Sequence, residues 1–262
     1  MAYQSCTTPS GTLSPRRTAC RVARKNGFTL VELAIVLVIV ALLVGGMFIS
    51  LSTSRDIANE KETQKQLASI NEALLGYAAA QQRLPCPAAP ATTGIESPPG
   101  GGPCANSYTG FVPAITLGIT PTNAQGYAID AWGNPIRYAV TTVTANGSTN
   151  AFTTNGGLKS AWANQANILP DLRVCNTAAS IATNDCPAAD QLTNSAVAVV
   201  FSTGRNGSDT PDVTHTDELA NWISSNDRVF VNTAPSATFD DLVVWLSPNI
   251  LYNRLISAGR LP

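Results

Sequence analysis

The sequence predicts an α+β protein in which one long N-terminal helix packs against an antiparallel β-sheet. The first observation is an apolar run from Phe28 to Leu51 that contains a single charged residue, Glu32. The second is a polar segment from Arg55 to Arg83 with an apolar stripe at helical spacing. The third is a series of short β-type runs, separated by turn residues, in the second half of the chain.

The apolar run has the length of a membrane span, because a bilayer core takes about 20 helical residues. Five basic residues and no acidic residue precede Gly27. The positive-inside rule therefore predicts a single pass with a cytoplasmic leader and an exported body. A secretory signal peptide is the alternative, but its apolar part would be shorter and would end in small residues before the cut.

Glu32 is the unusual residue of this run. A carboxylate costs about 2.5 to 3.5 kcal/mol at the centre of a membrane helix on insertion scales, and less near the end. A soluble core helix would not place it there, and a plain anchor has no use for it. A simple signal anchor with an incidental glutamate is the competing interpretation.

A basic leader ending in Gly27, then Phe28, then Glu32 at the fifth position of the remaining chain resembles the prepilin family of type IV pili and type II secretion pseudopilins. The resemblance implies that a prepilin peptidase cuts after Gly27 and methylates the new amine of Phe28. It also implies that Glu32 pairs with the Phe28 amine of a neighbouring subunit, which offsets the cost of burying either charge alone. A leader of 27 residues is long for this family, and a start at Val22 would give an ordinary length.

These features divide the chain into four predicted segments, and Pro85 is expected to end the long helix. They are a leader at 1–27 that is removed, a transmembrane and assembly half of the helix at 28–51, an amphipathic half at 52–84, and a globular head at 85–262. The resemblance implies a pilin-like fold in the bacterial inner membrane with a periplasmic head, which later enters a pilus or pseudopilus. It implies as partners other copies or other pilin-like subunits, the prepilin peptidase and an inner-membrane assembly platform.

Strands of the head are expected at four places, namely 136–143, 196–201, 228–232 and 239–246. Ser247-Pro248 should open a short helix, as N-cap and first turn. The run from Asp130 to Pro135, the Ser202-Thr203-Gly204 loop and the last strand all resemble the pseudopilin head. Residues 145–195 are rich in Asn, Thr and Ala, and we expect an insertion there that carries partner specificity.

Cysteines beyond the apolar run fit an oxidising compartment. Cys86, Cys104, Cys175 and Cys186 allow three connectivities. We favour Cys86–Cys104 and Cys175–Cys186 because each pair closes a short loop, a closure that contributes roughly 3 kcal/mol. Free thiols or a zinc site are the alternatives, and the lack of a CxxC pair and of a second histidine disfavours zinc.

Calcium is the one cofactor that the sequence leaves open. The major pseudopilin of type II secretion binds calcium in the loop that corresponds to Asp209, Asp212 and Asp217, and oxygen ligands on a loop suit this ion. Solvated loop acids, without a fixed ligand spacing, are the alternative.

Catalysis is not expected. His215 is the single histidine, and the chain has no Gly-x-Ser-x-Gly elbow. Asp240 and Asp241 are adjacent in an expected strand, so their side chains should point to opposite faces rather than converge. All 17 acidic residues follow Gly27, which argues against a basic nucleic-acid surface.

The sequence therefore favours a structural subunit that polymerises through its N-terminal helix, in a type IV pilus or a type II secretion pseudopilus. The alternative is a minor pilin that binds a surface, DNA or a secreted substrate through residues 145–195. A membrane-tethered enzyme is the third and least favoured class.

Overall fold

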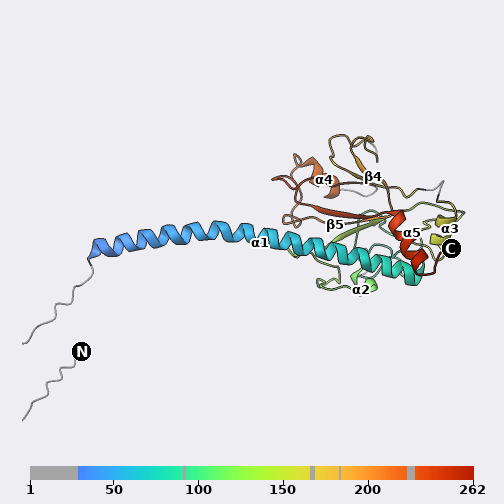
Figure 1. The fold of residues 1–262 in the computed structure, drawn as a ribbon, viewed down its shortest axis with the longest axis horizontal. Coiled ribbons are helices and arrows are strands. Elements are labelled where there is room, and N and C mark those ends of the chain that lie inside the picture. Colours follow the sequence, from blue (N-terminus) through green and yellow to red (C-terminus); the bar gives the residue numbers. More distant parts are fainter. Residues whose placement is uncertain (1–28, 91–92, 166–168, 183, 223–227) are drawn as a thin grey trace, which may run out of the picture. The chain divides into compact units, whose positions relative to one another are not determined.

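A computed structural model describes residues 29–90, 93–165, 169–182, 184–222 and 228–262, without the side chains of 45–54. The leader, Gly27 and Phe28 lie outside the described residues, as does Val22. Two units, Met1–Ser50 and Leu51–Pro262, are described separately. The helices and strands are α1 Leu30–Gln81, β1 Gly110–Phe111, α2 Ala114–Leu117, β2 Arg137–Val140, α3 Gly157–Ala163, β3 Leu172–Cys175, β4 Gln191–Ala196, β5 Ala198–Ser202, α4 Thr216–Trp222, β6 Val229–Val231, β7 Leu242–Leu246 and α5 Pro248–Ser257 (Figure 1).

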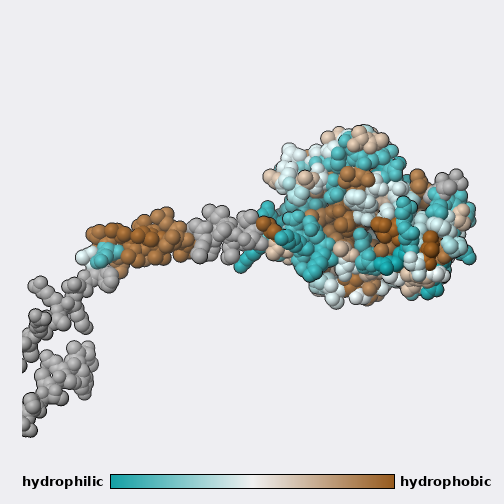
Figure 2. Space-filling view, in the orientation of Figure 1, coloured by the Kyte–Doolittle hydropathy of each residue, from teal (hydrophilic) through white to brown (hydrophobic). Residues whose placement is uncertain are grey.

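The first unit contains the beginning of α1. Its side chains from Leu30 to Val44 are apolar apart from Glu32, and all are exposed in the single chain. Figure 2 shows them as a continuous hydrophobic surface. Among the described residues, no helix combines the length and the apolar content needed to cross a membrane.

The later part of α1 belongs to the second unit and is amphipathic, as the stripe predicts. Leu67, Ile70, Leu74 and Ala78 are buried at three- and four-residue spacing. The helix ends at Gln81, four residues before Pro85, and the next residue has a left-handed φ of 56°. This end directs the chain into the loop that carries the first disulfide.

The main sheet has the strand order β1-β2-β5-β7 and is antiparallel throughout. Strand alternation gives it two apolar faces. Tyr138 and Val200 lie in the cluster shared with α1 and α5, while Val199 and Phe201 lie in the cluster on the opposite face. The sheet is therefore a middle layer, with the later part of α1 along one side of it (Figure 1).

A smaller sheet of order β4-β3-β6 covers the opposite face. Strands β3 and β6 are parallel, which the sequence did not predict. A parallel pair needs a crossover connection, and α4 lies on the path that leads into β6.

Residues 145–195 supply β3 and most of β4, and they also contribute Phe152 and Leu158 to the core against α1. This region therefore forms part of both hydrophobic clusters, and removing it would expose them.

Most expected strands occur with shorter bounds. The expected run at 196–201 covers the end of β4 and most of β5, and the run at 239–246 contains β7. Ser247 caps α5 as predicted, since its hydroxyl accepts a hydrogen bond from the Ile250 N–H at 3.3 Å.

Candidate functional site

The start of α1 is held by two reciprocal hydrogen bonds between Thr29 and Glu32. The Glu32 N–H donates to the Thr29 hydroxyl at 3.2 Å, and the Thr29 N–H donates to a Glu32 carboxylate oxygen at 3.5 Å. This pattern is a capping box, which satisfies backbone N–H groups that a helix start otherwise leaves without acceptors. The cap places the helix start directly after Phe28, the residue that cleavage would make N-terminal.

The charge at this helix start is set by Glu32. It is the only ionisable side chain between Thr29 and Val44, and it lies in the first turn of α1. A carboxylate there interacts favourably with the positive end of the helix dipole. An ammonium group created at Phe28 would add a second positive charge at the same end. Glu32 is therefore placed to interact with its own helix end, and its pairing with a neighbour's ammonium stays a prediction.

The two head motifs singled out in the sequence meet in the structure. Asp130 accepts hydrogen bonds from the Ser202 hydroxyl at 2.6 Å and from the N–H groups of Trp132 and Asn134 at 2.9 and 2.8 Å. The Asn134 amide in turn donates to the Gly204 carbonyl at 2.7 Å. The Asp-x-Trp-Gly-Asn-Pro turn is thus joined to the Ser-Thr-Gly loop through the side chains of two motif residues, Asp130 and Asn134.

This junction also contacts α1, because the Ala131 N–H donates to the Thr63 hydroxyl at 3.2 Å. Thr63 is fully buried on the helix. The motifs therefore connect the head sheet to the later part of α1, which gives them a structural role.

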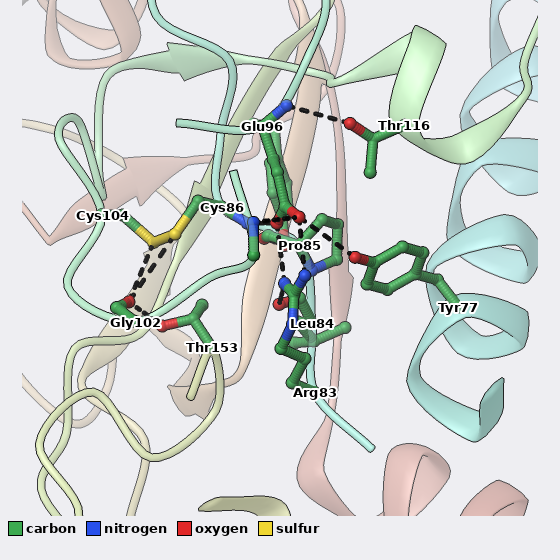
Figure 3. A network of polar contacts seen from close by, with 12 residues as sticks. Tyr77, Arg83, Leu84, Pro85, Cys86, Glu96, Gly102, Cys104, Thr116 and Thr153 are labelled. Carbon is green, nitrogen blue, oxygen red and sulfur yellow. Dashed lines mark hydrogen bonds and ion pairs between the residues drawn. A yellow bond between two sulfur atoms is a disulfide. The ribbon is translucent and has the colours of Figure 1, made fainter. Parts of the chain in front are cut away.

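The end of α1 is tied to the following loop by a buried ion pair between Arg83 and Glu96 (Figure 3). Arg83 donates from Nη1 to Oε2 at 2.7 Å and from Nη2 to Oε1 at 2.6 Å. The carboxylate also accepts from the Tyr77 hydroxyl at 3.2 Å and from the Cys86 and Gly100 N–H groups, each at 3.1 Å. No local spacing pattern in the sequence indicates this pair.

The ion pair stays charged near neutral pH. Burial raises the pKa of Glu96, but the hydrogen bonds from Arg83 and from the Cys86 N–H outweigh this effect, so the pKa lies below its ordinary value. Burial and the Glu96 charge raise the pKa of Tyr77 to about 12, so its hydroxyl remains a donor. Both oxygens of the Glu96 carboxylate thus accept hydrogen bonds from donors of the same chain.

Gly101 allows the loop to close over this pair. Its φ is +81°, and a Cβ there would come within 2.3 Å of the Thr153 carbonyl oxygen and 2.8 Å of Arg83 Nη1. Glycine at position 101 is therefore explained by its positive φ and by the close approach of the Thr153 carbonyl and the Arg83 guanidinium.

The structure contains the disulfides Cys86–Cys104 and Cys175–Cys186, with Cα–Cα distances of 5.4 and 6.5 Å. This is the pairing that the loop lengths favour. The first bond lies beside the Arg83–Glu96 pair, because Cys86 also donates its N–H to Glu96 (Figure 3). The second lies in a small apolar cluster with Val229.

The three acids proposed as calcium ligands, namely Asp209, Asp212 and Asp217, share no hydrogen-bond partner in the part of the chain that the structure describes. Asp209 is exposed, and Asp212 accepts from the Thr214 N–H and hydroxyl at 2.9 and 2.8 Å. Asp217 accepts from the Ala178 N–H at 2.6 Å. A calcium site on this loop stays a prediction, and Asp227 of the same loop lies outside the described residues.

Carboxylates do converge nearby, at Glu218, Asp240 and Asp241. One oxygen from each lies within 4.8 Å of the others, and within the described ranges this is the group of metal-ligating side chains that the geometry brings together. The expectation that Asp240 and Asp241 diverge is therefore wrong. Strand alternation does not apply to them, because β7 begins only at Leu242.

Burial dominates the chemistry of this acid group. It raises the pKa of Asp241 to about 8, with the Asn221 amide donating to its carboxylate at 2.8 Å. Burial also raises the pKa of Asp240, against the hydrogen bond from the Arg205 N–H. His215 Nδ1 lies 3.5 Å from Glu218 Oε2, so the single histidine faces an acid rather than a nucleophile.

The comparisons with known proteins concern the N-terminal segment. Residues 22–48 match the family model of the prokaryotic N-terminal methylation motif. No curated protein and no solved structure matches the chain. The chain thus has an α+β head preceded by a helix with a capped, acidic first turn. It carries the prepilin-type signal of type IV pilins and pseudopilins, which points to a structural subunit rather than an enzyme.

Proposed function

We propose that this chain is a filament subunit of a type IV pilus or a type II secretion pseudopilus. A prepilin peptidase removes residues 1–27 and methylates the amine of Phe28. The subunit then assembles through the apolar half of its N-terminal helix. The observation that carries the proposal is the match to the N-terminal methylation motif across 22–48, a range that contains Gly27, Phe28 and Glu32.

The physical support comes from the start of α1. The capping box begins at Thr29, the residue after Phe28 in the sequence, so cleavage after Gly27 creates an ammonium one residue before a capped, apolar helix. Glu32 of an adjoining subunit supplies the opposite charge in an apolar environment, where neither charge is stable alone. The first turn therefore has the parts that pairing between subunits needs.

The proposed location is the inner membrane, with residues 28–51 spanning it once and the head in the periplasm. The proposal rests on the hydropathy of that run and on the basic residues before Gly27. The disulfides of the head agree with an oxidising compartment. An inner-membrane assembly platform is the expected partner, and neighbouring pilus or secretion ATPase genes distinguish the two machines.

Processing at Gly27 tests the proposal. Replacing Gly27 by Ala or by the larger Leu should block leader removal, because a side chain there fills a site that glycine leaves open. The measurement is the apparent mass of the full chain in cells with and without the peptidase. Asn26→Ala is the control and should be cut normally. Normal cutting of both Gly27 variants would refute the cleavage site.

A second candidate function is recognition by a minor pilin through residues 145–195. A hollow of about 410 Å³ with both polar and apolar lining favours it, and its described lining residues come from this region apart from Arg228. Asn184 and Asn194 line it. The double variant Asn184→Ala with Asn194→Ala should spare assembly and lower adhesion or substrate capture. Unchanged capture would remove this candidate.

A further inference from the structure

An arginine stacked on aromatic rings lies at the start of β2, which runs between β1 and β5 in the main sheet. Arg137 is the first residue of β2 and pairs in register with Phe111 of β1. Its Cζ atom lies 4.7 Å from the Phe111 ring centroid and 5.7 Å from that of Trp222. The Tyr127 ring stacks on Phe111 at 4.5 Å. We refer to these four residues as the arginine stack.

The charge of Arg137 has no partner among the described residues. Its guanidinium takes part in no hydrogen bond and no ion pair there, whereas the Arg83 guanidinium donates two hydrogen bonds to a carboxylate. Burial lowers the pKa of Arg137, and no neighbouring acid opposes this effect. Among the residues that the structure describes, the charge of this half-buried guanidinium is therefore offset by ring faces.

Ring faces leave the hydrogen-bonding capacity of the guanidinium unused. A guanidinium carries five N–H donors at its edge, and stacking engages only its faces. The rings also restrict the orientation of the plane, which reduces the entropy lost when a ligand binds. A carboxylate matches such an edge with two parallel hydrogen bonds. Its single charge suits a single arginine, whereas a phosphate dianion would call for further donors.

Resting on the proposed function, we infer that Arg137 binds an Asp or Glu side chain of a second copy of this chain. All 17 acidic residues lie after Gly27, so the processed subunit has an excess of carboxylates over its basic residues. Assembly through the N-terminal helix brings copies side by side. The arginine stack then receives a neighbour's carboxylate and contributes a contact between heads, separate from the Glu32 contact between helix ends.

Carbodiimide cross-linking of the full chain in cell membranes tests this contact. The reagent joins an amine to a carboxylate with no spacer, so it reports direct ion pairs. Arg137→Lys places an amine at the stack, and Arg137→Gln removes the charge. Lys159→Gln is the matched control, because Lys159 is an exposed cation on α3. Leader removal is measured in the same samples by mass, and folding by the melting temperature.

The expected result is a cross-linked dimer that joins position 137 to an acidic residue of the same polypeptide sequence. It should be at least tenfold more abundant in Arg137→Lys than in Arg137→Gln, with Lys159→Gln unchanged from the wild type. If the Arg137→Lys chain is processed, folded and assembled but lacks that link, the inference is overturned and the proposed function stands. A link only to a different protein has the same consequence. An unprocessed chain overturns both.

Discussion

Thr29 and Glu32 hydrogen-bond to each other at the first turn of α1. Glu32, which is expected to pair with the amine of a neighbouring subunit, therefore also caps its own helix. The two roles use different properties of the side chain. Capping needs an acceptor oxygen at the third helical position, whereas pairing with an ammonium needs a negative charge. The roles can therefore be separated by substitution.

Glu32→Gln should keep the cap and lose assembly. Glutamine retains the acceptor oxygen that a capping box uses, but it has no charge for a neighbour's ammonium. Thr29→Ala should do the reverse, with a cost of about 1 kcal/mol to the helix start and filaments retained. Filament yield, with leader removal as the processing control, measures both. Normal filaments from Glu32→Gln would remove the pairing argument.

The buried Arg83–Glu96 pair predicts an asymmetry between single and double variants. Glu96→Leu should destabilise the head by about 3 to 5 kcal/mol, because it leaves the guanidinium buried without its carboxylate. The double variant Arg83→Met with Glu96→Leu should recover part of that loss, since neither charge remains. Urea unfolding of the oxidised protein measures both. A double variant no more stable than Glu96→Leu would show that the pair is not the source of the effect.

Asp241 predicts that the head loses stability as the pH rises. Its folded pKa of about 8 lies above its ordinary value of 3.8. Between these values the folded state binds more protons than the unfolded state, so the free energy of unfolding falls from about pH 4 to about pH 8. Each unit of difference corresponds to about 1.4 kcal/mol.

Asp241→Asn should flatten this dependence and raise the melting temperature at pH 8. Asparagine keeps an acceptor for the Asn221 amide and carries no charge beside Glu218 and Asp240. Melting curves between pH 4 and pH 8, with and without a chelator, provide the measurement. A wild type that gains stability over this interval would contradict the prediction, and a chelator-dependent melting temperature would support the calcium expectation.

The features that can be predicted from the sequence are those that depend on residues close together in the chain. The stripe of Leu67, Ile70 and Leu74 repeats at helical spacing, so the buried face of α1 follows from it. Cys86–Cys104 and Cys175–Cys186 were favoured because the loops between them are short. The capping box was also present as Thr29-x-x-Glu32, although only the acid was interpreted.

The features that escaped prediction depend on distant contacts. Strand β4 alternates half-buried polar residues with the exposed Leu192 and Asn194, so its only strongly apolar side chain faces away from the core. Arg83 and Glu96 meet across a loop that a disulfide closes, so no fixed spacing relates them. Asp240 and Asp241 converge on Glu218 because the chain enters β7 only after them.

The N-terminus of the mature protein is the most direct test of the central claim that a leader is removed to expose an amine beside a capped, acidic helix start. Intact-mass and peptide mass spectrometry of the chain purified from its own cells should find a first residue Phe28 carrying an N-methyl group. A mature chain that begins at Met1, or at any residue after Leu51, would contradict the account.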